Sequence, residues 1–215
     1  MANVERAYNL TTIADTRAHY DTWAATYNEE LADPSQGYVA PGIAAQYVLK
    51  HLNSSSATTT ATIDSSIRIL DAGCGTGLVG AALSSFGADH IDGVDLSPGM
   101  LEHARKTGAY KDLETADLSQ PLKFDSNAYD IVVCIGTLTQ GHVGPEALTE
   151  FVRVAKKGGL VVATIVDYVY EKLGYKTRVE KLESEGKATV VSNEVEDYRR
   201  GAGIKARMLV LKVLG

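Results

Sequence analysis

The segment IRILDAGCGTGLVG, residues 67–80, decides the fold of this chain. Ile67, Ile69 and Leu70 predict a short buried strand, and the apolar residues from 78 to 83 predict the start of a helix. The glycines between these elements stand where a side chain would keep a ligand away from the backbone. In open α/β sheets, ligands bind at such a strand-to-helix turn. The segment therefore predicts a nucleoside cofactor beside this loop.

Two cofactors fit the glycine loop. Gly75, Gly77 and Gly80 have the spacing of a dinucleotide-binding loop, and Asp95 lies at about the right distance for a ribose carboxylate, so a nicotinamide cofactor is an alternative. Asp71 argues against it, because a fixed negative charge at the loop entrance repels a pyrophosphate. S-adenosylmethionine carries an ammonium and a sulfonium group instead, which a carboxylate favours. We therefore expect S-adenosylmethionine, with S-adenosylhomocysteine as its product.

The next segments predict the rest of a parallel sheet. Residues 90–108 read as strand, loop and helix, with Ser97 as the N-cap and Pro98 at the first helical position. Asp95 then ends a strand where it can accept hydrogen bonds from both ribose hydroxyls. A third strand is expected to end at Asp117 and Leu118, where Asp117 can accept the adenine amino proton. The fourth strand is expected at residues 129–137, and the fifth at 156–166 after a helix stop at Gly158 and Gly159.

In this order, the motifs LDAGCGTG, GVDLS, TADL and YDIVVCIGTL resemble those of the class I S-adenosylmethionine-dependent methyltransferases. Within that superfamily the chain looks most like the methyltransferase-like proteins named after the Williams-Beuren syndrome region. That closer match rests on HYDTWAATYNEEL, GHVGPEALTEFVRVAKKGGLVV and KLESEGKATVVSNEVEDYRRG. The resemblance implies a cofactor site formed by Tyr27, Asp71, Gly73, Cys74, Gly75, Gly77, Asp95, Leu96, Met100, Asp117, Leu118 and Ile135.

The expected fold is α/β: a doubly wound, seven-stranded, mostly parallel Rossmann-like sheet. The C-terminal segments 187–198 and 204–214 are expected to complete it as an antiparallel strand pair. We expect a single methyltransferase domain over residues 1–215, with an N-terminal helical lid at 1–52 and the cofactor-binding core at 67–215. The Ser/Thr/Ala tract at 53–66 has no periodicity that could bury a face and predicts a flexible insertion.

The composition of the chain indicates which classes of partner it can bind. The net charge of −6 and the scattered basic residues argue against a nucleic-acid substrate. No apolar stretch approaches ~20 residues and no signal-peptide core is visible, so we expect a cytoplasmic protein that does not bind membranes. Two cysteines are too few for a disulfide framework or a zinc site, and no ligand cluster predicts a metal. The chain is expected to act as a monomer or homodimer.

Aromatic residues are the candidates for the substrate side. Tyr20, Trp23 and Tyr27 recur at helical spacing, so they share one face of a predicted N-terminal helix. Either this face packs on the sheet as core, or it is a lid over the methionine end of the cofactor and the substrate. Tyr168 and Tyr175 follow the fifth strand, where substrate walls are common in this superfamily; exposed surface tyrosines are the alternative.

His142 is the candidate catalytic residue, and also a candidate substrate contact. It stands in a glycine-flanked loop after the fourth strand. Methyl transfer needs mostly alignment and a dry site, and it needs a base only if the nucleophile must lose a proton. The alternative is that His142 caps the helix that begins near Pro145.

The sequence thus predicts methyl transfer to an oxygen, nitrogen or sulfur of a small-molecule substrate. Two alternatives stay open. The same fold can hold S-adenosylmethionine and catalyse a cyclisation or rearrangement without methyl transfer, or it can serve as a non-catalytic binding module. Accumulation of S-adenosylhomocysteine on turnover separates methyl transfer from both.

Overall fold

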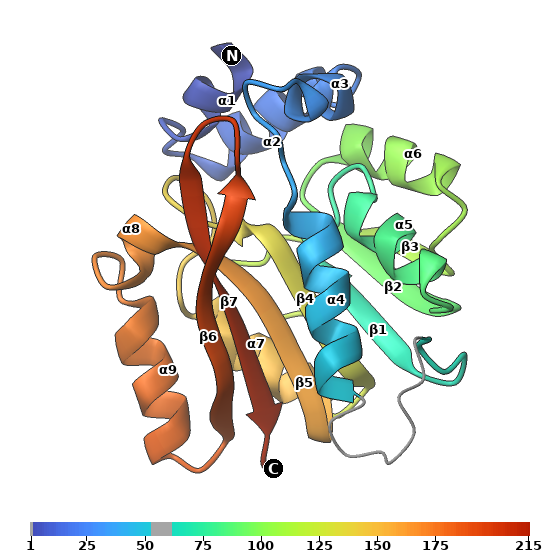
Figure 1. Ribbon diagram of the computed structural model, residues 1–215, viewed down its shortest axis with the longest axis vertical. Coiled ribbons are helices and arrows are strands. Elements are labelled where there is room, and N and C mark those ends of the chain that lie inside the picture. The colour runs from blue at the N-terminus through green and yellow to red at the C-terminus, as the bar shows by residue number, and fades with distance from the viewer. Residues whose placement is uncertain (1, 53–61) are drawn as a thin grey trace.

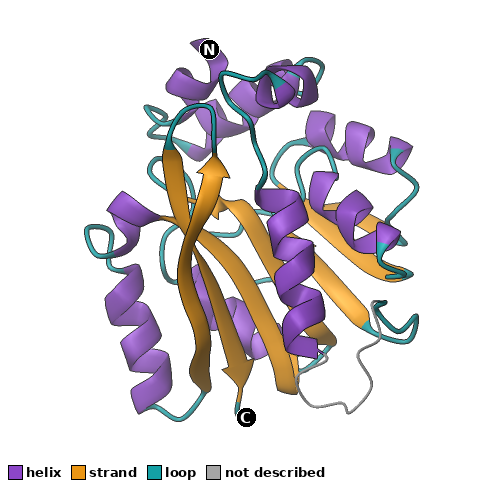
Figure 2. Ribbon diagram, in the orientation of Figure 1, coloured by secondary structure: helices purple, strands orange, loops and turns teal. Residues whose placement is uncertain are grey.

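Seven strands form one sheet in the order β3-β2-β1-β4-β5-β7-β6, as Figure 2 shows. The computed structural model describes residues 2–52 and 62–215. The strands are β1 Arg68–Ala72, β2 His90–Asp95, β3 Asp112–Thr115, β4 Tyr129–Leu138, β5 Ala155–Val166, β6 Ala188–Arg199 and β7 Ile204–Val213. This architecture confirms the predicted α/β fold with its antiparallel C-terminal pair.

The strand order creates the crevice in which a ligand can bind. Strand β1 pairs in parallel with β2 on one side and with β4 on the other, so the chain reverses its direction of winding between them. Ligands of open α/β sheets bind at the carboxyl ends of the strands at such a reversal. Strands β4 and β5 are apolar along most of their length because helices cover both faces of the sheet there. The antiparallel β6–β7 hairpin extends the sheet beyond β5.

Helices cover the sheet in two layers, and a third group lies across one end (Figure 1). Helices α4, α5 and α6 lie on one face, and α7 and α9 on the other. Helices α1, α2 and α3 lie over the end of the sheet where β1, β2 and β4 finish. In the part of the chain that the structure describes, the helices are α1 Ala2–Ala7, α2 Ile13–Trp23, α3 Tyr27–Ala32, α4 Ala40–Leu52, α5 Leu78–Ser85, α6 Pro98–Lys106, α7 Ala147–Val154, α8 Asp167–Tyr170 and α9 Tyr175–Ser184.

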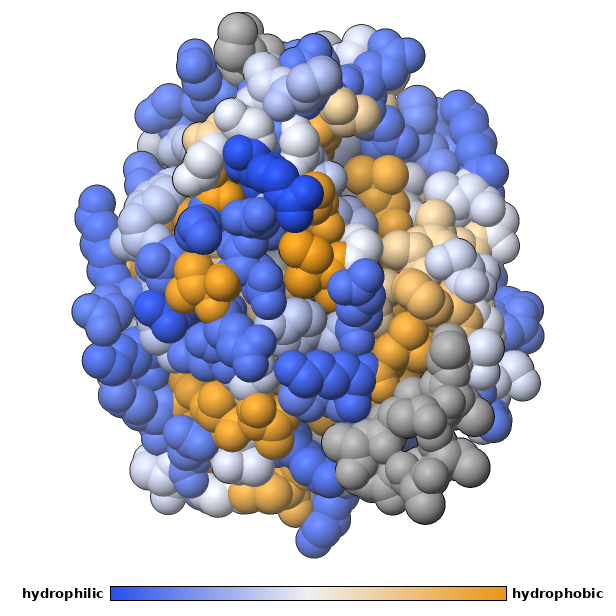
Figure 3. Space-filling view, viewed as in Figure 1, coloured by the Kyte–Doolittle hydropathy of each residue, from blue (hydrophilic) through white to orange (hydrophobic). Residues whose placement is uncertain are grey.

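Strand β6 is an edge of the sheet, and its outer surface is protected by charge. Glu194 is exposed and Asp197 partly exposed along it, on the same strand as the exposed Val191 and Val195. Charged side chains on an edge strand discourage pairing with a further chain. Figure 3 shows this face of the molecule as mostly hydrophilic, with apolar groups in separate small areas. None of the described helices combines the length and the apolar character that a membrane-spanning helix needs.

Two local predictions are corrected. Gly158 and Gly159 do not stop a helix: α7 ends at Val154, and both glycines lie inside β5. A side chain at Gly159 would meet the backbone oxygen of Asp130 at 2.6 Å, so this glycine permits a close approach of two strands. The third strand ends at Thr115 rather than at Asp117, which leaves Asp117 in the loop beyond it.

The N-terminal aromatic face is built from two helices rather than one. Helix α2 ends at Trp23, and Tyr27 begins α3. The two helices still bring Tyr20, Trp23 and Tyr27 together, with ring centroids 5.6 Å apart for Tyr20 and Trp23 and 4.7 Å apart for Trp23 and Tyr27. Trp23 packs with Val4, Ala7 and Leu31 in a small apolar cluster separate from the main core.

The predicted flexible insertion at 53–66 falls mostly on residues 53–61, which lie outside the described residues. The following segment is anchored. Ile63 is buried in the main core, and its backbone N–H donates to the carbonyl of Phe86 at 2.6 Å. The prediction of an unpacked surface tract is therefore wrong at its C-terminal end, where one apolar side chain enters the core.

Tyr110 holds the base of the glycine loop. Its hydroxyl donates to Oδ2 of the fully buried Asp71 at 2.7 Å and accepts the backbone N–H of Gly80 at 3.1 Å. Any side chain at Gly80 would collide with the Tyr110 ring. The third glycine of the apparent dinucleotide motif therefore makes room for a tyrosine. Through that tyrosine, the end of β1 is joined to the first turns of α5.

Burial raises the pKa of Asp71 to about 7, and the neighbouring Asp95 carboxylate acts in the same direction, while the bond from Tyr110 opposes them. A pKa raised by folding means that the folded state holds the proton more tightly than the unfolded state. Asp71 therefore lowers the free energy of unfolding as pH rises from its unfolded pKa of about 4 towards 7.

We predict that the free energy of unfolding of the wild type falls between pH 5 and pH 7, and that ionisation of Asp71 accounts for about 2 kcal/mol of this fall. Asp71→Asn has no carboxyl group at this position, so its free energy of unfolding should fall by about 2 kcal/mol less. Urea unfolding of the ligand-free protein at both pH values measures this difference. The matched variant Asp89→Asn replaces an exposed carboxylate before β2 and should keep the wild-type loss. An equal pH dependence in wild type and Asp71→Asn would show that Asp71 is ionised throughout this range.

Candidate functional site

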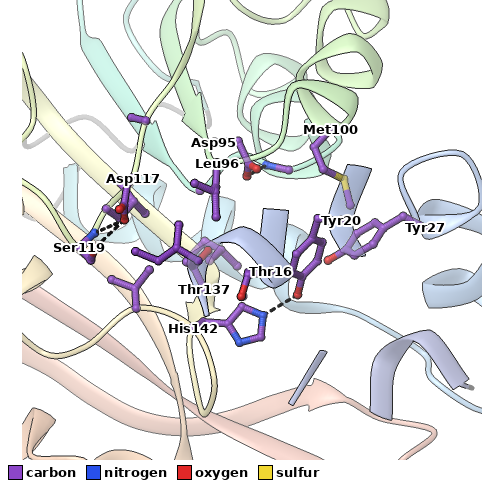
Figure 4. A pocket seen from close by; sticks show the side chains of 18 residues that line it. Thr16, Tyr20, Tyr27, Asp95, Leu96, Met100, Asp117, Ser119, Thr137 and His142 are labelled. Carbon is purple, nitrogen blue, oxygen red and sulfur yellow. Dashed lines mark hydrogen bonds between the residues drawn. The ribbon is translucent and has the colours of Figure 1, made fainter. Parts of the chain in front are cut away.

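A cavity lies at the carboxyl ends of β1, β2 and β4, beneath helix α2 (Figure 4). It holds about 790 Å³ of empty space, its open mouth included. It is lined by Ile13, Thr16, Tyr20, Tyr27, Gly73, Gly75, Asp95, Leu96, Met100, Ala116, Asp117, Leu118, Ser119, Ile135, Gly136, Thr137, His142 and Val143.

Asp95, at the end of β2, is held in place by two backbone groups. Its Oδ2 accepts the N–H of Gly75 at 2.8 Å, and its Oδ1 accepts the N–H of Ser97 at 2.9 Å. Burial raises the pKa of Asp95, and these hydrogen bonds oppose the rise. A carboxylate has about four lone-pair sites, so each oxygen keeps capacity for one more donor. The geometry suits a carboxylate that accepts from two neighbouring hydroxyls, as a ribose presents them.

Gly75 is the glycine whose open side faces the cavity. A side chain built on it would meet nothing within 4 Å, and its φ of +55° is in the left-handed region that favours glycine. Gly77 differs, because a side chain there would press on Thr107, Tyr110 and the backbone of Ala104. The loop therefore offers a ligand bare backbone at Gly75, whereas Gly77 lets the loop pack on α6.

The far end of the cavity combines apolar walls with one carboxylate. Leu118 and Ile135 are buried, and Met100 of α6 lies on the same lining. Oδ1 of Asp117 accepts from the backbone N–H of Ser119 at 2.9 Å and from its hydroxyl at 2.6 Å. This local turn fixes Asp117 at the rim. Flat apolar walls with an acceptor at the edge suit a purine ring that carries an amino group.

The structure brings most of the predicted cofactor residues together and leaves three out. Asp71 lies beneath the loop and is hydrogen-bonded to Tyr110, so its carboxylate does not line the cavity. Cys74 packs against Leu101 and Ala104, away from the cavity. Gly77 faces α6. The residues that do line the cavity as predicted are Tyr27, Gly73, Gly75, Asp95, Leu96, Met100, Asp117, Leu118 and Ile135.

Three predicted substrate contacts do not line this cavity. Trp23 is buried inside the cluster formed by α1, α2 and α3. Tyr175 is fully buried, and its hydroxyl donates to the carbonyl of Val143, which makes it a packing residue under the His142 loop. Tyr168 is 55% exposed, as in the surface alternative. Tyr20 and His142 do reach the cavity.

Tyr20 and His142 form a hydrogen-bonded pair in the cavity wall (Figure 4). Nδ1 of His142 lies 2.9 Å from the carbonyl oxygen of Gln140, which can only accept, so Nδ1 carries the ring proton. Nε2 then accepts the Tyr20 hydroxyl, at 2.6 Å. Burial lowers the pKa of His142, which favours its neutral form at neutral pH. Because the ring is engaged in this way, it does not cap α7.

Sequence reasoning missed several residues of the lining, including Ser119, Thr137 and Val143. For the residues of α2, the helical spacing could have predicted their place in the lining. Ile13 and Thr16 precede Tyr20 by seven and four residues, so all three lie on one helical face that points into the cavity. The aromatic pattern drew attention to Trp23 instead, which packs inside the N-terminal cluster.

Comparison with known proteins agrees with this geometry. A family model described as "Methyltransferase domain" matches residues 69–159. Methyltransferase-like protein 27 of Homo sapiens is 37% identical over 164 residues, which are 76% of this chain and 62% of that protein. Over residues 69–159 the chain is therefore similar to a methyltransferase domain. It spans less than two thirds of the human relative's length.

Two solved structures share the methyltransferase fold. The [4+2]-cyclase SpnF superposes with a TM-score of 0.67 at 19% identity, over 96% of this chain and 98% of that one. Magnesium protoporphyrin IX methyltransferase (ChlM) from Synechocystis PCC 6803, with bound S-adenosylhomocysteine, gives a TM-score of 0.57 at 18% identity, over 81% of this chain and 83% of that one. S-adenosylmethionine is the cofactor that the sequence motifs predict. The cradle at Gly75, the paired acceptor sites of Asp95 and the apolar end near Leu118 fit its methionine, ribose and adenine parts.

We predict that Asp95→Ala lowers the affinity for S-adenosylmethionine at least about a hundredfold, because it removes two hydrogen bonds to a charged group, each worth ~1.5–3 kcal/mol. Isothermal titration calorimetry measures the change. Asp89→Ala, at the opposite end of β2, is the matched control and should bind as the wild type does. An unchanged dissociation constant in a folded Asp95→Ala protein would remove Asp95 from the cofactor site.

Proposed function

We propose that this protein transfers the methyl group of S-adenosylmethionine to an oxygen, nitrogen or sulfur atom of a small molecule. One observation carries the proposal: the hydrogen-bonded pair of Tyr20 and His142 lines the same cavity as Asp95 and Gly75. A nucleophile beside the pair would therefore share a partly enclosed space with the cofactor. Methyl transfer depends mainly on such alignment in a site that excludes water.

Residues in the loops after the strands would bind the cofactor, and residues of the N-terminal helices would cover it. When bound, the cofactor supplies an electrophilic methyl group on its sulfonium. Asp95, Gly75 and Asp117 hold and orient it from the loops at the ends of the strands. Tyr20 and Tyr27, from α2 and α3, cover the cavity and exclude water from it.

The pair of Tyr20 and His142 offers a path for the proton that the nucleophile loses. Nε2 of His142 already accepts the Tyr20 hydroxyl, so a substrate group would meet the tyrosine oxygen first. Tyr20 can pass its proton to Nε2 while it takes the substrate's proton. Burial raises the pKa of Tyr20, so the hydroxyl stays protonated until the transfer occurs. His142 is thus the catalytic base, and Tyr20 relays the proton.

The size and charge of the site support a small substrate. The cavity lies under α2, and its apolar walls include Ile13, Val143 and Ile135. The net charge of the chain is −6, whereas a nucleic-acid substrate requires clustered positive charge. A small organic molecule is therefore the acceptor that this site fits best.

We predict that His142→Gln lowers kcat about 10²–10⁴-fold for an acceptor that must lose a proton, while cofactor affinity stays unchanged. In the wild type, the rate should fall as pH drops through the lowered pKa of His142, because the protonated ring cannot act as a base. His142→Gln should lose that inflection. The readout is release of S-adenosylhomocysteine across the pH range, with a panel of phenols, amines and thiols as acceptors.

Two further variants complete this test. Tyr20→Phe should lower kcat in the same direction if the hydroxyl relays the proton. His90→Gln, at the start of β2 and exposed, should behave as the wild type. Full activity in His142→Gln would contradict the proton path. Turnover of a substrate without S-adenosylhomocysteine release would instead favour a cyclisation or rearrangement, and cofactor binding without turnover of any substrate would favour a binding module.

A further inference from the structure

A second cavity adjoins the first on the far side of Tyr20 and His142. It holds about 360 Å³ of empty space, its opening included, and shares Tyr20, Tyr27, Gly136 and His142 with the first cavity as lining. Most of its other walls are aromatic or apolar. Three side chains in the lining have a buried polar atom without a hydrogen bond: Arg199, Thr139 and Trp23. The Trp23 side chain interacts with Glu30, which leaves Arg199 and Thr139 to be explained.

Arg199 is a buried cation without an anionic partner. It ends β6, is only 6% exposed, and donates from Nη1 to the neutral Oε1 of Gln36 at 2.9 Å. Its guanidinium carbon lies 5.4 Å from the centre of the Tyr8 ring. Its Nε is buried and makes no hydrogen bond. Within residues 2–52 and 62–215, no carboxylate forms an ion pair with it.

A guanidinium stays charged in proteins, and a buried charge without a counter-charge is costly. The hydroxyl of Thr139 adds a second buried polar atom without a partner in the same lining. Two unsatisfied polar groups of this kind in one cavity call for an explanation, since buried polar groups are nearly always paired. An anionic ligand that enters the cavity would satisfy both.

We propose that the second cavity binds the carboxylate of the substrate, so that the acceptor of methyl transfer is a small carboxylic acid. Arg199 would pair with the carboxylate, Thr139 would donate its hydroxyl, and the accepting atom would lie towards Tyr20 and His142. This inference rests on the proposed function. A carboxylate fits better than a phosphate, because one guanidinium balances one negative charge and the remaining lining is largely aromatic.

The other role open to Arg199 is mechanical. Gln36 and Tyr8 both belong to the N-terminal segment, and Tyr38 forms an isolated β-bridge with Arg199. Arg199 therefore also ties this segment to the tip of the β6–β7 hairpin. A test must separate a cation that holds the segment from a cation that holds a ligand. Gln36→Leu does so, because it removes the neutral partner and leaves the charge in place.

The test uses four acids as probes: benzoate, 4-hydroxybenzoate, phenylacetate and 3,4-dihydroxybenzoate, each with its primary amide. Calorimetry measures their binding to the protein saturated with S-adenosylhomocysteine. At least one acid should bind ten or more times more tightly than its amide. Arg199→Met should abolish that preference, Arg199→Lys should restore part of it, and the isosteric Thr139→Val should weaken the acid severalfold. Gln36→Leu should retain it.

The inference is overturned if no acid binds, if acids and amides bind alike, or if Gln36→Leu loses the preference as Arg199→Met does. Affinity for S-adenosylhomocysteine shows whether each variant is folded. If Arg199→Met does not fold, the comparison of Thr139→Val and Arg199→Lys with the wild type replaces it. Turnover separates the two proposals. Binding of 4-hydroxybenzoate and 3,4-dihydroxybenzoate through Arg199 without methylation of a hydroxyl would refute the proposed function alone. Methylation of amides that is insensitive to Arg199→Met would refute the carboxylate site alone.

Discussion

The carboxylate of Asp95 joins the two loops on which the site depends. By accepting from Gly75 and Ser97, it fixes the glycine loop after β1 against the start of α6. Both loops sit at the point where the strand order reverses, so a displacement of either would close the crevice between β1 and β4. Tyr110 supports the same loop from beneath, through Asp71 and Gly80. The cofactor half of the site is therefore rigid before any ligand arrives.

The part of the cavity proposed to hold the methyl acceptor is formed by other elements of the chain. It comes from α2 and α3, whose apolar residues form a cluster separate from the main core, and from the loop that carries His142. Among the described residues, α1, α2 and α3 form no strand pairing themselves; the segment after them joins β6 through the bridge between Tyr38 and Arg199. Side-chain hydrogen bonds link the helices to the core: Asp21 accepts from Ser97 and Gly99, and Asn28 accepts from Thr76. Elements that are attached in this way open locally at a lower cost than core strands. A rigid cofactor half with a detachable cover suits an enzyme that must admit a substrate and then exclude water.

Much of the fold and of the proposed cofactor site could be predicted from sequence, because Gly75, Asp95 and Asp117 lie at the ends of successive strands or in the loops just beyond them. What depended on packing could not be predicted. Asp71 and Trp23 have the right residue types, but Tyr110 and the small N-terminal core turn them away from the first cavity, and Trp23 lines the second one instead. The burial of Arg199 could not be predicted from sequence, since it arises only when the β6–β7 hairpin meets the N-terminal segment.

The central claim is that the N-terminal helices complete the active site by closing over the cofactor. Amide hydrogen exchange of the whole chain, with and without S-adenosylhomocysteine, tests it most directly. Residues 18–30 should exchange quickly in the free protein and at least tenfold more slowly in the complex, while β1 and β4 stay protected in both states. Equal protection of residues 18–30 with and without the ligand would contradict the claim and make α2 and α3 a fixed part of the protein's packing.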